Sequence, residues 1–342
     1  MLTKTLVIAV AGLAIAAPAM ARDEIRIVGS STVFPYTQAV AENFVNLTGA
    51  ASPIVESTGT GGGMKIFCGG IGEAFPDVTG ASRAMKSSEF ELCQSNGVTD
   101  ISEALIGFDG LSMAVSRESA VDWNLSLKDI YLALAAQVPV DGEWADNPHQ
   151  TWADVNPDLP AIDILAYGPP PTSGTRDAFV ELAMHEGCKE LHFVEEGGFD
   201  KKWVKENCSR MRQDGPFVEA GENDNLIVQR LNADENAMGI FGYSFLYENL
   251  DALKGVQIEG VSPSTETIAD KSYPISRPLF VYFKNAHRGV IPNLDAFIEE
   301  YMSDDALEDD GYLAERGLVA LSEDARYDLQ DDVLDAVSME MN

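Results

Sequence analysis

The chain of 342 residues is poor in basic side chains. Its 23 Lys and Arg stand against 55 Asp and Glu, which gives a formal net charge of −32 at pH 7. A surface this acidic repels nucleic acid phosphates and anionic lipid headgroups at long range, so neither is an expected partner. Hydrophobic residues still make up 45% of the chain and aromatic residues 8%. This composition is typical of a globular protein with room for two domains.

The sequence also lacks the run of ~20 apolar residues that a membrane-spanning helix needs. The apolar stretch Leu6–Ala17 is shorter; Lys4 precedes it and Ala19-Met20-Ala21 follows it. A basic start, a short apolar stretch and a small-x-small site are typical of a signal peptide. We therefore predict a signal peptide over residues 1–21 and a mature protein in the periplasm. Arg22 rather than Cys follows the site, so no lipid anchor is expected.

Cysteine is scarce as well: the chain has only Cys68, Cys93, Cys188 and Cys208. In an exported chain an even count indicates disulfides, and the pairs Cys68–Cys93 and Cys188–Cys208 would close the shorter loops. The alternative is a metal site in which His185, Cys188 and His192 share a helical face with Cys208. No second spacing supports zinc, so the disulfides are favoured. A closed loop of ~20 residues would add roughly 3 kcal/mol of stability.

The familiar motifs of nucleotide binding and hydrolysis are missing. Gly59-Thr60-Gly61 begins like a dinucleotide fingerprint, but Met64 occupies the place of the third glycine. Lys65 is not preceded by glycine, so the P-loop signature fails too. No Gly-x-Ser-x-Gly elbow is present. The four histidines, which we interpret as surface residues, are His149, His185, His192 and His287. No cofactor is expected.

Predicted strands and helices alternate along the mature chain. Glu24–Gly29 alternates like a strand, and an apolar-faced helix follows it up to Gly49. Ala104–Val115 is a long apolar run that indicates a buried strand. The alternation predicts an α/β fold rather than a sandwich. The segment Val138–Pro160 is rich in Pro and Asp and is predicted to be an exposed loop.

Three loops rich in Ser, Thr and Gly each follow a predicted strand and begin a helix: Ser30–Val33, Ser57–Gly63 and Thr172–Thr175. A helix N-terminus offers unpaired N–H groups and the positive end of the helix dipole. Small residues let an oxyanion approach those groups closely. A single such loop indicates no more than an ordinary N-cap. Three loops in one chain, one of them followed directly by Arg176, favour an oxyanion site.

The loops belong to a longer series of motifs that covers nearly all of the mature chain: Gly29–Pro35, Ser57–Gly63, Gly80–Arg83, Leu127–Tyr131, Ser173–Phe179, Ala237–Tyr243 and Tyr273–Ile275. In this joint order the series resembles the periplasmic phosphate-binding proteins of the phosphate ABC transporter. The resemblance implies a two-lobe, type II-like α/β fold with two hinge strands and the ligand in the cleft between the lobes. One lobe would comprise residues 22–112 and 279–342, and the other 113–278. The hinges would lie near Leu111–Val115 and Pro278–Val281.

The resemblance also implies a function. The protein would be a monomeric receptor, not an enzyme, that binds inorganic phosphate and delivers it to permease subunits in the inner membrane. The implied ligand-binding residues are Ser31, Thr32, Val33 through its N–H, Thr60, Ser173, Gly174 and Thr175. Two alternatives stay open: a receptor for sulfate, molybdate or tungstate, and a secreted phosphatase on the same fold. A phosphatase would need a metal or an activated nucleophile.

Two positions depart from the family pattern. Arg83 stands where some members carry an Asp that accepts the phosphate proton, and Pro169 stands where some carry an Arg. We interpret Arg83 and Arg176 as cationic clamps and Asp177 as the acid that orients an arginine. Arginine only donates hydrogen bonds. The site should therefore discriminate weakly against sulfate, and phosphate affinity should rise as the second phosphate proton, pKa near ~6, is lost.

Overall fold

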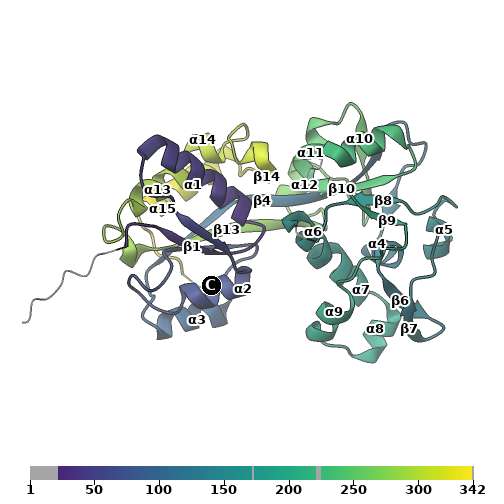
Figure 1. Ribbon diagram of the computed structural model, residues 1–342, viewed down its shortest axis with the longest axis horizontal. Helices are drawn as coiled ribbons and strands as arrows, with labels where there is room; N and C mark the ends of the chain where they lie inside the picture. The colour runs from purple at the N-terminus through teal and green to yellow at the C-terminus, as the bar shows by residue number, and fades with distance from the viewer. Residues whose placement is uncertain (1–21, 172, 221–224, 341–342) are drawn as a thin grey trace, which may run out of the picture.

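The structure, a computed structural model, describes residues 22–171, 173–220 and 225–340. The predicted signal peptide and Thr172 of the third loop lie outside the described residues. Figure 1 shows two bodies side by side, which we name the first and the second lobe. The first lobe contains the beginning and the end of the described chain, and the second contains its middle. No helix among the described residues is both long and apolar enough to cross a membrane.

The predicted α/β layering is confirmed, with fourteen strands and a set of mostly short helices in the described chain. The strands are β1 Arg26–Gly29, β2 Ile54–Ser57, β3 Val78–Ala81, β4 Ile101–Ser116, β5 Asn124–Leu125, β6 Gln137–Val140, β7 Glu143–Asp146, β8 Ala166–Gly168, β9 Phe217–Glu219, β10 Met238–Gly242, β11 Leu253–Gly255, β12 Gln257–Ile258, β13 Ser276–Lys284 and β14 Leu318–Val319. The α-helices are α1 Phe34–Thr48, α2 Thr60–Phe67, α3 Ser87–Ser95, α4 Leu127–Leu134, α5 Trp152–Val155, α6 Gly174–Phe179, α7 His185–Lys189, α8 His192–Gly197, α9 Lys201–Asn207, α10 Asn225–Ala233, α11 Tyr243–Glu248, α12 Thr265–Ala269, α13 Leu294–Tyr301, α14 Asp304–Leu307 and α15 Glu323–Leu334. A π-helical turn, Val180–Met184, joins α6 to α7, and 3₁₀ turns occur at Asn285–His287 and Ala314–Arg316.

The first lobe is built on strands in the order β2-β1-β3-β13-β4. Strand β1 runs parallel to both β2 and β3. The carboxyl ends of these three strands therefore meet at one edge, which is where ligands bind in open α/β sheets. The predicted Ser30–Val33 and Ser57–Gly63 loops both leave the sheet at this edge. Glycine permits their close packing, because a Cβ on Gly63 would lie 2.5 Å from the Cα of Gly29.

Strand β4 has 16 residues and runs through both lobes. Its first part pairs with β13 from Ile101 to Gly110, and its second part pairs with β10 from Leu111 to Val115. The chain thus crosses between the lobes at Gly110–Leu111, where the Leu111 N–H donates to the carbonyl of Ile275 at 3.0 Å. Pro278–Val281, expected near a hinge, is paired inside the first sheet. The division of the chain into lobes at residues 112 and 278 stays a prediction.

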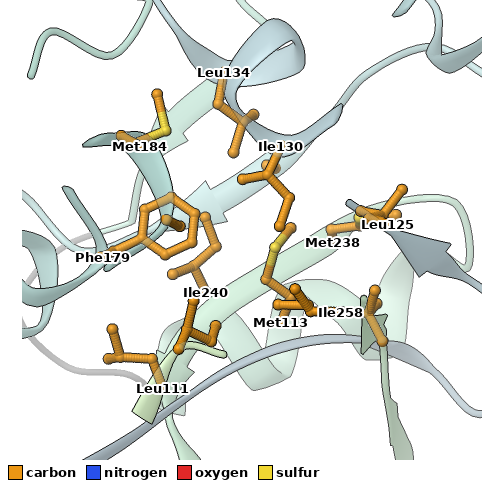
Figure 2. Close-up of a cluster of buried hydrophobic side chains, with 14 of the residues drawn as sticks. Leu111, Met113, Leu125, Ile130, Leu134, Phe179, Met184, Met238, Ile240 and Ile258 are labelled. Carbon is orange, nitrogen blue, oxygen red and sulfur yellow. The ribbon is translucent and has the colours of Figure 1, made fainter. Parts of the chain in front are cut away.

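Each lobe has its own buried apolar cluster. In the second lobe, Leu111 and Met113 from β4 lie against Met238 and Ile240 from β10, with helix residues such as Ile130 packed over them (Figure 2). The first lobe buries a separate cluster between α1, α13 and the sheet, in which the rings of Phe44 and Phe297 meet edge to face. Apolar cores in both lobes, with a further cluster around α2 and α3 in the first lobe, leave the space between the lobes to polar groups.

The predicted loop Val138–Pro160 is wrong, because it contains the antiparallel hairpin β6–β7 and the helix α5. The turn residues Asp141 and Gly142 both have positive φ, 52° and 84°. An Asp-Gly pair between two strands is a strong hairpin signal. The pair Asp141-Gly142 could therefore have predicted this hairpin from the sequence. Trp152, which is fully buried, anchors the segment to the core.

Both favoured disulfides are present in the structure: Cys68–Cys93 joins the end of α2 to α3, and Cys188–Cys208 joins α7 to the end of α9. The alternative metal site is therefore wrong, since its two cysteines are bonded to each other. Among the described residues no group of three His, Cys, Asp or Glu could hold a metal ion. The prediction of four surface histidines also fails for His287, which is 1% exposed.

Candidate functional site

An open cleft of about 1200 Å³ lies between the lobes. Its walls combine the carboxyl ends of β1, β2 and β3 with the helical segment from α6 to α9. Among the predicted ligand-binding residues, those that line it are Ser31, Thr32, Thr60, Arg83 and Arg176. Ser173, Gly174, Thr175 and the side chain of Val33 do not line it in this arrangement of the lobes.

The first loop turns directly from β1 into α1. The Ser30 hydroxyl accepts a hydrogen bond from the Thr32 N–H at 3.1 Å, which holds the turn. Val33 is the N-cap residue of α1, and its side chain is 1% exposed. A Cβ on Gly80 would lie 2.8 Å from this side chain, so Val33 packs on the sheet. Only the backbone of Val33 is left to serve as a donor, as the resemblance implies.

The second loop places Thr60 at the first turn of α2. Its hydroxyl oxygen lies 3.1 Å from the hydroxyl of Ser82 and accepts the Ser82 N–H at 3.1 Å. Ser82 also lines the cleft, although the sequence did not single it out. The two hydroxyls therefore form one polar group at the edge of the sheet. Its signal was the Gly80-Ala81-Ser82 turn itself.

The third loop meets the first where the two lobes come together. A Cβ on Gly174 would lie 3.2 Å from the carbonyl oxygen of Ser31, so the two loops touch although 143 positions separate them. The Ser173 hydroxyl accepts the Thr175 N–H at 3.2 Å and so serves as the N-cap of α6. Capping accounts for Ser173, while Gly174 permits the contact between the lobes.

Arg176 is 8% exposed and reaches the cleft from α6. Its Nη1 donates to the carbonyl of Pro169 at 3.0 Å, and its guanidinium lies 4.7 Å from the centre of the Phe217 ring. Burial lowers the pKa of Arg176, and the nearby charges of Glu219 and Asp177 oppose that shift. Among the described residues it makes no ion pair. A buried arginine with spare donors is suited to bind two oxygens of one oxyanion at the same time.

Arg83 has a different environment from Arg176. It lies on the cleft wall, but both ends of its guanidinium bind the Glu89 carboxylate, at 2.7 Å and 2.8 Å. Because Arg83 donates these hydrogen bonds to the Glu89 carboxylate, its pKa is raised despite its partial burial. Because the fork is occupied, the net charge that Arg83 presents to the cleft is small.

Arg277 is a second cleft residue that the sequence did not single out. It lies at the start of β13, is 5% exposed, and lines the cleft. Its Nε donates to Asp109 at 3.2 Å and its Nη1 to Glu181 at 2.9 Å, while Nη2 donates to the Thr32 hydroxyl. Arg277 therefore joins the crossing strands, the first loop and the second lobe. The available signal was an arginine directly before the predicted hinge segment Pro278–Val281.

Two acids face these arginines. Asp177 follows Arg176 in α6, and Glu181 lies one turn later; both line the cleft. Burial and the charge of Glu181 raise the pKa of Asp177, whereas Arg277, Arg176 and a hydrogen bond with Ser31 act against the rise. Asp177 is thus an exposed carboxyl group of the cleft, placed among cations and hydroxyls.

The cleft as a whole has the opposite charge balance to the protein. Eight of the 23 Lys and Arg residues line it, against three acids, Asp177, Glu181 and Glu186. The cations are Arg83, Lys86, Arg176, Lys189, Lys201, Lys205, Arg210 and Arg277. Hydroxyl groups, helix N-termini and excess positive charge together make a site for a small anion.

Comparison with known proteins agrees with this chemistry. A model of the PBP superfamily domain matches residues 14–305. The phosphate-binding protein PstS of Staphylococcus saprophyticus is 31% identical, over 74% of this chain and 68% of its own length. The chain belongs to the PstS-like family of phosphate-binding proteins. Membership in this family confirms the resemblance read from the sequence.

Two further relatives support the same family and its fold. The SphX protein of Synechococcus elongatus is 29% identical, over 80% of this chain and 72% of its own length. The crystal structure of a possible phosphate binding protein from Planctomyces limnophilus covers 92% of this chain and 99% of its own, with a TM-score of 0.72 and 28% identity. The PstS-like fold therefore extends over both lobes, as predicted.

Proposed function

We propose that this protein binds inorganic phosphate in the cleft between its lobes and delivers it to an ABC permease in the inner membrane. The observation that carries the proposal is the convergence of Thr32, Thr60, Arg176 and Arg277 on one cleft. Residues 1–21 would export the chain to the periplasm. Relatives that carry the name phosphate-binding protein support the choice of ligand.

The proposed site uses neutral and charged donors in different ways. The first two loops would supply hydroxyls from Ser31, Thr32 and Thr60, together with the N–H of Val33. The third loop, Ser173–Thr175, already touches the first loop at Ser31 and would turn its donors to the anion when the second lobe closes. Arg176 would supply the charge, since it is buried, weakly screened and free of ion pairs among the described residues. Arg277, whose charge is already paired with Asp109 and Glu181, would position the Thr32 hydroxyl. Arg83 belongs to this proposal only as a paired residue of the rim.

Asp177 is the proposed acceptor of the phosphate proton. Because Arg83 cannot accept a proton, a phosphate-selective site needs a carboxylate elsewhere, and Asp177 lies on the cleft beside Arg176. An acceptor favours a ligand that carries a proton and repels sulfate, which carries none, so this proposal replaces the weak discrimination against sulfate expected from Arg83 alone. Asp177→Asn should therefore narrow the ratio of phosphate to sulfate affinity, with Asp129→Asn on α4 as a control away from the cleft.

Isothermal titration of phosphate, sulfate and arsenate into the mature protein tests the proposal. We expect phosphate to bind in a 1:1 complex and sulfate to bind more weakly. Tight binding of sulfate, molybdate or tungstate with no heat from phosphate would identify a receptor for another oxyanion. No heat from any of these anions would contradict the proposed function altogether.

We further propose that the protein is a receptor and not an enzyme. A phosphatase on this fold would need a metal or an activated nucleophile. Incubation with phosphomonoesters, with and without a chelator, measures the difference. Steady release of phosphate that grows with time and enzyme concentration would contradict the receptor.

A further inference from the structure

Three cations line the cleft at α9 of the second lobe, which lies farther from the crossing strands than α6 does (Figure 1). They are Lys201 and Lys205 on α9 and Arg210 just after it, and all three line the cleft and are exposed. Within the described residues none of them has an acid within ion-pair distance. We name them the outer cation cluster. In a chain with a net charge of −32, three unpaired cations on one wall indicate a role in binding rather than ordinary surface solvation.

The helix α9 separates its cations by face. Lys201 and Lys205 are four residues apart and so share one side of the helix, toward the cleft. Lys202 and Glu206 share another side and lie 3.8 Å apart as an ion pair. Asp200, the acid nearest in sequence, caps the helix by accepting the Trp203 N–H at 2.8 Å. The unpaired charge is therefore confined to the cleft side.

A covalent bond fixes the position of this wall. The Cys188–Cys208 disulfide joins the end of α9 to α7, and Arg210 follows two residues later. Val204, between the two lysines, is 4% exposed and packs in the second-lobe core. The backbone that carries the cluster is thus rigid, and its long side chains alone can follow an anion.

The remaining charges around the cluster do not cancel it. Lys189 is paired with Glu186 at 2.5 Å, and Arg83 with Glu89. Lys86 on the first lobe also faces the cleft without an ion pair among the described residues. An approaching anion meets net repulsion from the acidic protein and a local excess of positive charge at this opening. Charge of one sign in a cleft focuses the field and raises association rates by about 10–10³-fold.

We propose that Lys201, Lys205 and Arg210 form an outer anion site that captures a small dianionic oxyanion at the mouth of the cleft and passes it to the inner donors. The proposal rests on the proposed function of the inner site. The outer site acts on the rate of association, because its exposed side chains hold the anion weakly and release it. The bound complex is held by the inner donors, so its rate of dissociation does not depend on the cluster.

The test is rapid mixing of inorganic phosphate with the mature protein, followed by tryptophan fluorescence, at ionic strengths from about 20 mM to 0.5 M. The variant is Lys201→Gln/Lys205→Gln/Arg210→Gln, and Lys202→Gln is the matched control on the same helix. We expect the triple variant to associate about ten-fold more slowly at low salt. Its rate should approach that of the wild type at high salt, with an unchanged dissociation rate and unfolding midpoint.

Each alternative outcome has a definite meaning. An association rate equal to that of Lys202→Gln at low salt overturns the outer site and leaves the inner site intact. A faster dissociation rate with unchanged association also overturns it, because the cluster would then hold the bound ligand. If the triple variant unfolds, the single variant Lys205→Glu replaces it with the same expectation. Wild-type protein that binds no phosphate at any salt contradicts the proposed function and the outer site with it.

Discussion

The two ends of the first-lobe sheet carry similar polar groups and use them differently. At the amino ends of β1 and β3, Asp77 and His287 are almost completely buried, and Arg22 lies beside them. At the carboxyl ends, Thr32, Thr60 and Arg277 line the cleft. We name the first group the base cluster. Both regions contain arginine and buried hydrogen bonds, yet only the second of them lines an open cleft.

The base cluster is satisfied within the protein. Asp77 accepts from Arg22 at 2.6 Å and from the Arg26 N–H at 2.8 Å, and it lies 2.6 Å from Nδ1 of His287. The opposite ring nitrogen of His287 accepts the Gly72 N–H at 2.8 Å, so Nδ1 carries the proton. Burial acts to raise the pKa of Asp77, but these hydrogen bonds hold it below its ordinary value.

Lys284 completes the base cluster, and its hydrogen-bond partners also lie within the protein. It is fully buried and donates to the carbonyls of Gly70 and Pro76 at 2.7 Å and 2.9 Å. Burial and charge therefore do not identify a binding site by themselves. A set of polar groups whose partners all belong to the chain stabilises the fold, whereas unused donors on a cleft are available to a ligand.

The largest expected effect comes from breaking the base cluster. Asp77→Ala would leave Arg22 and Lys284 without their buried counter-charge, which should lower the free energy of unfolding by about 3–5 kcal/mol. Phosphate affinity of the protein that remains folded should not change. Urea unfolding and calorimetry measure the two quantities. A loss of affinity without a loss of stability would reverse the roles of the two regions.

The next effect is expected on the cleft side. Arg176→Ala should weaken phosphate binding by roughly 2–5 kcal/mol, as for the loss of one buried charged partner. The fold should survive, because Arg176 makes no ion pair among the described residues. Calorimetry of the variant gives the affinity, and its unfolding curve is the control. Binding as tight as that of the wild type would remove Arg176 from the site.

A smaller effect is expected from a neutral donor of the cleft. Thr60→Val deletes one hydroxyl and should cost on the order of 1.5–3 kcal/mol of phosphate affinity, as for a hydrogen bond to a charged group. Thr48→Val, at the far end of α1, is the control and should leave the affinity unchanged. Equal affinities in the two variants would exclude the second loop from the site.

The smallest effect concerns the pH dependence of the base cluster. Burial lowers the pKa of Lys284 from 10.5 to about 8. Above pH 8 the unfolded chain therefore binds more protons than the folded one at this residue, so its contribution to stability rises with pH. From pH 7 to 9 the gain should be on the order of 1 kcal/mol. Lys284→Met should lose this gain in the free energy of unfolding between pH 7 and 9. If stability changes with pH to the same extent in both proteins, the assignment to Lys284 is wrong.

Local patterns in the sequence predicted much of this molecule. Strand-loop-helix segments rich in Ser, Thr and Gly identified the anion loops, and the spacing of four cysteines identified both disulfides. These features depend on neighbours in the chain, for which side-chain type and periodicity are sufficient evidence. The order of the motifs then identified the family and the two-lobe fold.

Contacts between distant segments were decided only by the tertiary structure. The role of Arg277 follows from its hydrogen bonds to Asp109, 168 residues away across the β4–β13 pairing, and to Thr32, 245 residues away. His287 looked like a surface residue until the fold placed it against Asp77. The lysines of α9 belong to the cleft only because the second lobe faces the first. Propensity and periodicity describe the backbone near a residue, whereas partners and burial depend on which strands pair and which faces meet.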